Sequence, residues 1–277
     1  MSKAIVFDTE TTGSKQPMHI VEAAYIVLDD ELQIADTFRG LFNPEMPIAL
    51  GAKAAHHILD CEVASMPLWS TFSLPEDTAY VIGHKVDFDM DAIGLAEDTE
   101  IKRICTLAIA RKHLPELDSH TQSALIYHFF PEVTAREMIK NAHRAMDDVN
   151  NCHMLLCELS DVITSKGIAF ETFEDMWVES EHCRIPDKMS FGKHAGANIT
   201  DLPYDYKQWI MRQPDMESLI RALIKSKPGV TSARLFESAK EWAGCSEENE
   251  TDSKGRLWLL RDTMEFEGVL AGLIAEG

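Results

Sequence analysis

Four carboxylates and one histidine are placed where their chemistry could serve metal ions. The stretch IVFDTETTG, residues 5–13, is an apolar strand-like run followed at once by Asp8 and Glu10. Side chains at i and i+2 of an extended chain point to the same side, so the two carboxylates share the tip of the predicted strand. Clustered carboxylate oxygens are ligands that hard cations such as Mg²⁺ prefer. The alternative for this stretch alone is a solvated turn.

Two further aspartates lie on predicted buried helical faces. In GHKVDFDMDAIGL, Asp89 shares a face with Ala92 and Ile93. In HRAMDDVNNCHMLL, Asp148 falls on the same stripe as Cys152 and Leu155. Both carboxylates should therefore turn toward the core, where a charge is costly unless it is compensated.

Four converging carboxylates repel one another unless cations lie between them. This set fits a two-metal site, with ions about 3.5–4 Å apart that clamp the attacking and leaving oxygens of a phosphodiester. His143 precedes the second helix, and an imidazole there is suited to take a proton from the attacking water. Without this context, a histidine before a helix is usually structural or solvated.

Three motifs occur in order: FDTETTG, GHKVDFD and HRAMDD. They resemble the motifs of the DEDD-type 3'-to-5' exonucleases, in the subclass whose third motif is His-x-Ala-x-x-Asp. AAHHI at 54–58 and ICTLAIARKHLPEL at 104–117 resemble the bacterial exonuclease X group within it. The resemblance covers residues 4–160.

The resemblance implies an RNase H-like sheet, two Mg²⁺ or Mn²⁺ ions per active site, and release of nucleoside 5'-monophosphates from a 3' end. It also implies two roles for the five residues already named. The implied metal ligands are Asp8, Glu10, Asp89 and Asp148, and the implied general base is His143.

Weaker implications concern the substrate. His56 matches a family histidine beside the terminal nucleotide, and the backbone of Thr11, Thr12 and Gly13 would hold the terminal sugar. Lys85 stands where the family commonly has Asn. This lysine contacts phosphate or is a surface residue, and the sequence leaves both alternatives open.

The surrounding pattern predicts an α/β fold, with an RNase H-like mixed β-sheet flanked by helices. Strands are expected at 5–7, 20–28, 32–42, 80–83 and 101–104, the first three as an antiparallel meander. Helices are expected at 49–58, 87–96, 105–113, 119–129, 134–140 and 146–165. We predict an exonuclease domain over 1–166, an acidic linker over 167–187, a small C-terminal α/β unit over 188–227 and a helical tail over 228–277.

Composition points to an ordinary globular chain. Of its 277 residues 45% are hydrophobic, no stretch approaches the roughly 20 apolar residues of a membrane span, and no signal peptide pattern opens the chain. The six cysteines form no CxxC pair, which favours reduced, mostly buried thiols over a zinc site or disulfides. We therefore expect a cytoplasmic protein with no membrane partner.

The net charge of -20 argues at first against nucleic acid, because phosphate binding usually needs a basic surface. However, bound metal can meet phosphate in place of lysine. Residues 184–227 also carry a net charge of +3, with Tyr204, Tyr206 and Trp209 interleaved. Such a surface suits base stacking, although Phe191 and Trp209 could instead form the core of a small domain. Lys193 and His194 are the preferred contacts in this unit.

The carboxylate and histidine set predicts a metal-dependent nuclease, and the family resemblance implies that it is a 3'-to-5' exonuclease. We expect it to act on DNA, preferentially on single-stranded ends. The C-terminal region would contact DNA or a repair or replication partner. Within the enzyme class the alternatives are an RNA exonuclease or a polymerase proofreading subunit. Outside it the alternative is a nucleic-acid-binding module whose nuclease site has decayed.

Overall fold

The computed structural model describes residues 3–213 apart from 97, 99, 141, 186, 190 and 191. The chain divides into two compact units after Ser180, and each is described by itself. The predicted tail over 228–277 and residues 214–227 lie outside the described residues. None of the helices in the described part of the chain has the length and hydropathy needed to cross a bilayer.

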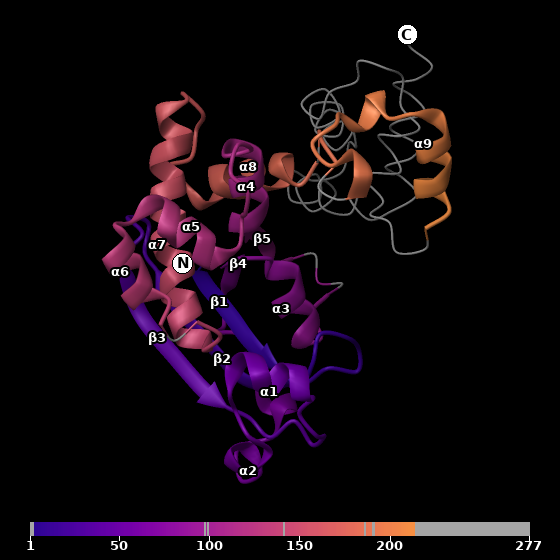
Figure 1. Ribbon diagram of the computed structural model, residues 1–277. Helices are drawn as coiled ribbons and strands as arrows, with labels where there is room; N and C mark the ends of the chain where they lie inside the picture. The colour runs from indigo at the N-terminus through magenta and orange to yellow at the C-terminus, as the bar shows by residue number, and fades with distance from the viewer. Residues whose placement is uncertain are drawn as a thin grey trace, which may run out of the picture. The chain divides into compact units, whose positions relative to one another are not determined.

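The first unit is built on a five-stranded mixed sheet in the order β3-β2-β1-β4-β5 (Figure 1). The pairs β1–β2 and β2–β3 are antiparallel, whereas β1–β4 and β4–β5 are parallel. The strands are β1 (Lys3–Thr11), β2 (Ile20–Leu28), β3 (Ile34–Leu41), β4 (Thr78–Gly83) and β5 (Lys102–Cys105). This confirms the predicted meander and mixed sheet.

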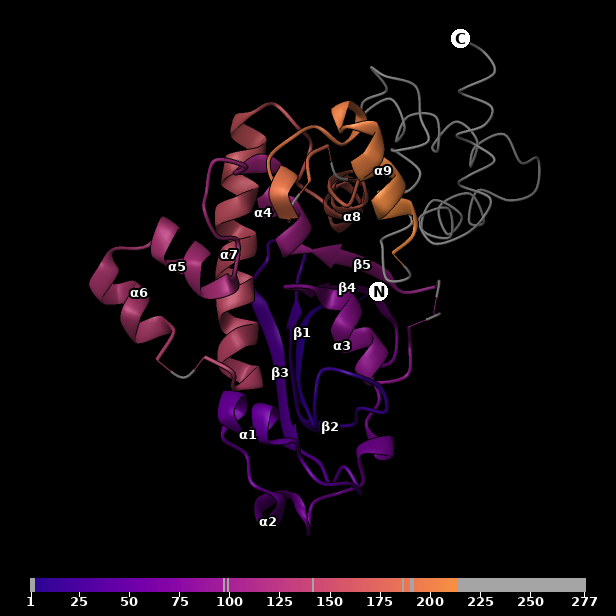
Figure 2. The same ribbon diagram turned by 45° about the vertical axis from the view of Figure 1, so that its right-hand side comes forward.

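The central strand β1 is apolar because it is covered on both faces. Ile5 and Phe7 pack on one face with Val86 and Met90 of α3 (Val86–Ala92). The long helix α7 (Ala145–Ser165) contacts β1 and β2, and Figure 2 shows it on the opposite side of the sheet from α3. Successive side chains of a strand point to opposite faces, so the even-numbered residues of β1 face α7.

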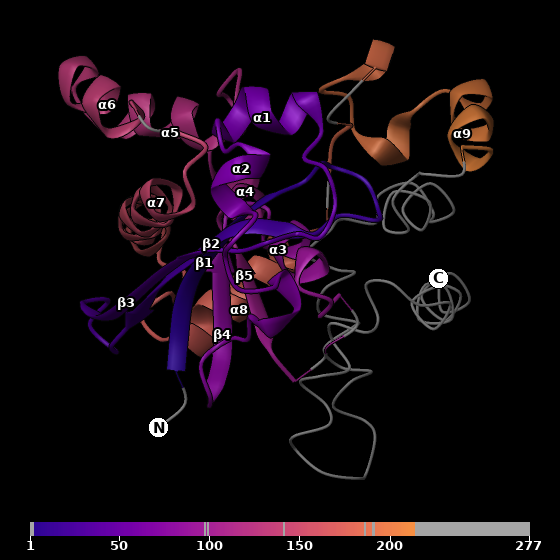
Figure 3. The same cartoon turned by 90° about the horizontal axis from the view of Figure 1, so that it is seen from below.

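The remaining helices of the first unit lie around the sheet and the two helices α3 and α7 that cover it. Helix α5 packs against α7 and α6 lies beside α5, as the view from below also shows (Figure 3). These helices of the first unit are α1 (Leu50–His56), α2 (Asp60–Val63), α4 (Thr106–His113), α5 (Gln122–Phe129) and α6 (Glu132–Met138), with a 3₁₀ helix at Trp69–Thr71.

The stretch expected as an acidic linker contains a helix, α8 (Phe173–Cys183), so the prediction of a linker over 167–187 missed this element. Phe173, Met176 and Trp177 form an apolar stripe at i, i+3 and i+4, and the last two are buried. Glu174 Oε2 accepts hydrogen bonds from Lys102 Nζ at 2.5 Å and from the Tyr80 hydroxyl at 2.9 Å. The acidic composition concealed a helix whose apolar face packs on the sheet unit.

The described part of the second unit is short. It contains 3₁₀ helices at Gly192–His194 and Ile199–Asp201, helix α9 (Tyr204–Met211) and one antiparallel bridge between Lys188 and Asn198.

Candidate active site

The topology brings three of the predicted carboxylates to one end of the sheet. Asp8 and Glu10 lie on the last part of β1 and face the same side. Since β4 runs parallel to β1, the helix that follows it, α3, starts at the same edge. There the backbone N–H and the hydroxyl of Thr9 both donate to Asp89 Oδ1, at 2.9 and 2.7 Å. Asp89 is thereby fixed directly beside the strand residue between Asp8 and Glu10.

A local irregularity marks the end of β1. Glu10 pairs with Glu22 of β2, but Thr11 pairs with Ile20, so the register shifts between Glu10 and Thr11. Bulges of this kind bend the strand and redirect side chains. The break lies immediately after the second carboxylate and begins the turn that carries Thr12 and Gly13.

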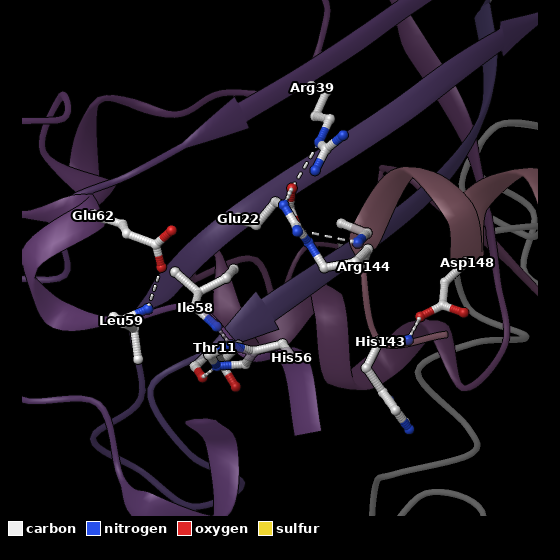
Figure 4. Close-up of polar contacts among 11 residues, drawn as sticks. Thr11, Glu22, Arg39, His56, Ile58, Leu59, Glu62, His143, Arg144 and Asp148 are labelled. Atoms are coloured by element: carbon white, nitrogen blue, oxygen red, sulfur yellow. Dashed lines mark hydrogen bonds and ion pairs between the residues drawn. The ribbon is translucent and has the colours of Figure 1, made fainter. Parts of the chain in front are cut away.

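The fourth carboxylate comes from the first turn of α7. Asp148 Oδ2 accepts the backbone N–H of His143 at 2.9 Å, and its Oδ1 accepts from Gln122 Nε2 at 3.0 Å. His143 has φ +67°, and this left-handed turn presents an exposed side chain just ahead of the helix (Figure 4). Ligand atoms of Glu10, His143 and Asp148 lie within 4.8 Å of one another. Strand β1 and the start of α7 therefore meet at one site.

The electrostatics of the cluster show an excess of negative charge. Burial, then the charges of Asp89, Asp148 and Glu10, raise the pKa of Asp8 well above its ordinary value. Burial and the Asp148 charge raise the pKa of Glu10 to about 8. Burial also raises the pKa of Asp89 to about 7 and that of Asp148 to about 6. The arrangement favours neutral carboxyls unless positive charge is supplied.

The donor set fits divalent cations. Every predicted ligand offers hard carboxylate oxygen. Burial and mutual repulsion raise the pKa of Asp8 and of Glu10, and for Glu10 they outweigh the positive charge of Arg144. Of the arginines near the cluster, Arg144 is committed to Glu22 through two hydrogen bonds of 3.1 Å. Asp8, Glu10, Asp89 and Asp148 could together hold such ions.

The predicted substrate contacts around the turn after β1 are largely internal. His56 is buried, with Nδ1 accepting from Ile58 N at 3.0 Å and Nε2 donating to the Thr11 carbonyl at 3.2 Å. The Thr11 hydroxyl donates to the Gly13 carbonyl at 2.7 Å, and the Thr12 hydroxyl accepts from His19 N at 3.1 Å. These groups brace the turn, and their contact with a nucleotide stays a prediction.

Lys85 lies at the N-cap of α3 with φ +80° and an exposed side chain, whose Nζ is 5.6 Å from the centre of the Phe88 ring. Asn tolerates the left-handed region better than most residues, so an Asn at this position would carry less backbone strain than a lysine. The lysine therefore costs some backbone strain. Burial raises the pKa of Asp89, whereas the hydrogen bonds from Thr9 and, more weakly, the positive charge of Lys85 lower it.

Lys193 and His194 belong to the second unit, in a turn packed on one aromatic ring. Lys193 Nζ is 5.3 Å from the centre of the Tyr206 ring, and the His194 ring is 4.4 Å from it. Tyr206 in turn stacks on Trp209 at 5.3 Å and 19°.

A Cβ on Gly192, which has φ +72°, would come 2.6 Å from the Tyr206 hydroxyl, so glycine is required there. Tyr206 is buried whereas Trp209 is 47% exposed, so Trp209 does not form the core; Phe191 lies outside the described residues.

Sequence reasoning missed the residues that support the acidic cluster. Glu22 is fully buried on β2 and accepts hydrogen bonds from Arg39, Arg144 and Ala145. Gln122 of α5 supports Asp148. The available signal was a single glutamate in the otherwise apolar strand IVEAAYIVL.

Comparisons with known proteins agree with this architecture. The alignment with a solved structure of exonuclease I covers the whole of this chain and 74% of the exonuclease I chain, at a TM-score of 0.52 and 13% identity. Exonuclease X in complex with 5' overhanging duplex DNA aligns with 62% of this chain and 98% of its own, at 23% identity and a TM-score of 0.46. The curated DNA polymerase III PolC-type of Bacillus cereus is 25% identical over 176 residues, which are 60% of this chain. The aligned part spans only 12% of that polymerase.

The five-stranded mixed sheet flanked by helices, with clustered carboxylates where its central strand ends, has an RNase H-like fold. Residues 5–156 match the family described as Exonuclease, RNase_T, which is more than half of the chain. The chain belongs to this exonuclease family, whose members use divalent metal ions.

Proposed function

We propose that this chain is a metal-dependent 3'-to-5' exonuclease of the His-containing DEDD subclass that works on DNA in the cytoplasm. It prefers single-stranded 3' ends and releases nucleoside 5'-monophosphates. The observation that carries the proposal is the meeting of Asp8, Glu10, Asp89 and Asp148 with His143 at the end of β1. Family membership supports hydrolysis at a chain end.

The four carboxylates would hold two Mg²⁺ or Mn²⁺ ions, one through Asp8, Asp89 and Asp148 and the other through Asp8 and Glu10. When bound, such ions would supply positive charge to the phosphodiester and acidify the attacking water. The hydrogen bonds from Thr9 and Gln122 fix two of the carboxylates, so that little reorganisation is needed when substrate arrives.

His143 accepts the proton of the attacking water at a ring nitrogen. Its exposed ring lies next to Glu10 and Asp148, and its backbone N–H is tied to Asp148. The same aspartate thus has two tasks: it holds a cation and sets the position of the base. A positioned base of this type contributes about 10²–10⁴-fold to a rate.

DNA is the proposed substrate because the similar curated protein is a DNA polymerase. The same observation favours a second candidate function, proofreading beside a polymerase. A pull-down with the tagged chain distinguishes the two, since a proofreading subunit should retain a polymerase under conditions in which a free nuclease retains none.

The proposed activity is tested with single-stranded DNA labelled at its 5' or 3' end. With Mg²⁺ we expect the 5' label to yield a ladder of shortened strands and the 3' label to appear at once as a mononucleotide. Chelator should abolish both, because the carboxylates alone repel phosphate. An RNA oligomer of equal length, added as competitor, measures the preference for DNA.

Internal cuts, shortening from the 5' end, or full activity in chelator would contradict the proposal. Binding without any shortening would instead support the decayed-site alternative. The variant Asp8→Asn is the matched control for a contaminating nuclease, since it should eliminate the shortening.

The second unit is proposed to bind single-stranded DNA. The half-exposed Trp209 ring, stacked on Tyr206, offers a face to a nucleobase, and Lys193 offers charge to phosphate. Aromatic stacking and a nearby cation are the usual means of binding single strands. A repair or replication partner stays the alternative use of this surface.

We expect Trp209→Ala to weaken binding of a labelled oligothymidine by about 5- to 150-fold, which corresponds to one lost base stack of about 1–3 kcal/mol. Fluorescence anisotropy in Ca²⁺ measures this affinity. The control is Gln208→Ala, an exposed neighbour on the same helix, which should bind like the unaltered chain. Equal affinities for Trp209→Ala and the control would exclude this surface from DNA binding.

A further inference from the structure

Glu22 is a buried carboxylate that the proposed reaction does not use. It lies on β2 directly opposite Glu10, and its side chain is 0% exposed. Residues opposite each other in an antiparallel pair share a face, so two like charges meet beside the acidic cluster. Such a placement is costly, and a strand residue of this kind needs a compensating role or compensating partners.

Glu22 has such compensating partners. Glu22 Oε1 accepts from Arg39 Nε at 2.7 Å and from an Arg144 terminal nitrogen at 3.1 Å. Its Oε2 accepts from Arg144 Nε at 3.1 Å and from the backbone N–H of Ala145 at 3.2 Å. Figure 4 shows the carboxylate between the two guanidinium groups. Two arginines thus offset one glutamate, and the pKa of Glu22 is lowered by Arg144 and Arg39 despite its burial.

The contact with Ala145 also substitutes for a missing helix cap. Arg144 is the N-cap residue of α7, and its side chain does not cap the helix. The first N–H groups of a helix need acceptors, and a carboxylate at this end is favourable for both hydrogen bonding and the helix dipole. Glu22 supplies that acceptor from a strand more than a hundred residues away in sequence.

Arg144, which is bound to Glu22, is the residue next to the proposed base His143. His143 precedes Arg144 and has a left-handed backbone, so its ring direction depends on how the next two residues are held. On one side its N–H is bound to Asp148, and on the other the chain is fixed to β2 through Glu22. The geometry points to Glu22 as a positioning residue that, through Arg144 and Ala145, sets the His143 ring beside Glu10 and Asp148.

This inference rests on the proposed function of His143, and the experiment separates the two. Glu22→Gln keeps the size of the side chain but removes the charge that pairs with Arg144. We expect kcat on 5'-labelled single-stranded DNA to fall by about 10-fold or more, with KM and the Mg²⁺ concentration for half-maximal rate within about 2-fold. In a His143→Ala background the same change should cost no more than about 2-fold, because the ring that it positions is gone.

Two matched controls isolate the effect. Arg39→Met removes a cation from the same carboxylate without touching α7, and Glu174→Gln breaks an ion pair elsewhere in the same unit. Both should keep kcat within about 2-fold. Should Glu22→Gln fail to fold, Arg144→Met removes the same link and should reproduce the loss of kcat.

The outcomes are distinct. If His143→Ala lowers kcat but Glu22→Gln does not, or if Glu22→Gln costs as much without His143 as with it, positioning by Glu22 is refuted and the proposed function stands. If His143→Ala leaves kcat unchanged, the assignment of the base fails and the positioning role fails with it.

Discussion

Replacing His143 with Ala should lower kcat by about 10²–10⁴-fold, the range for loss of a positioned general base. The shortening of single-stranded DNA, followed in single-turnover mode, measures this effect on the chemical step. The Mg²⁺ concentration for half-maximal rate should change little, because the four carboxylates are retained. Unchanged turnover would contradict the assignment of His143 as the general base.

The left-handed backbone at this position requires a second variant. At φ +67° an alanine is strained, whereas asparagine tolerates this region. His143→Asn therefore lacks a base but keeps the turn, and it should show the same loss of kcat. His128→Ala, which removes an exposed histidine from α5, is the control and should be as active as the unaltered chain.

The second large effect concerns stability without metal. The pKa values of Asp148, Asp89 and Glu10 are raised to about 6, 7 and 8, so the folded chain keeps protons that the unfolded chain releases near pH 4. Where the folded state binds more protons, the free energy of unfolding falls as pH rises, by about 1.4 kcal/mol per pH unit for each proton. In chelator we therefore expect Tm to drop between pH 5 and pH 8, by on the order of 5 °C or more.

Added Mg²⁺ should raise Tm more at pH 8 than at pH 5, because protons compete for the same oxygens. Differential scanning fluorimetry at several pH values measures both effects. Glu10→Gln should flatten the decline in chelator, since it removes the group whose pKa is raised to about 8. Glu132→Gln, a change at an exposed carboxylate on α6, should leave the slope unaltered. A Tm that rises with pH in chelator would contradict this account of the cluster.

Much of the fold follows from local pattern. The apolar run before Asp8 predicts the buried strand, and the stripe through Cys152 and Leu155 predicts α7, because parity and helical period fix which side chains face inward. Helix α8 was missed because its acidic residues outweigh the apolar stripe in composition. The sequence left two alternatives for Trp209, base stacking or a place in the core of the small unit. The second does not hold, because Tyr206 is buried and Trp209 is half-exposed.

The sequence by itself determined which side chains of the candidate site share a face. Parity places Asp8 and Glu10 together, helical period turns Asp89 inward, and the spacing in HRAMDD sets His143 five residues before Asp148. These are relations within one element, which backbone geometry fixes without reference to the rest of the chain.

Only the tertiary structure decided what supports these residues. The parallel pairing of β1 with β4 brings Asp89 to Thr9, and the antiparallel pairing of β1 with β2 sets Glu22 opposite Glu10. The link from Glu22 to Arg144 joins residues 122 positions apart. No local pattern encodes such a contact, because it depends on which strand faces which helix, and that is settled by burial of the whole sheet.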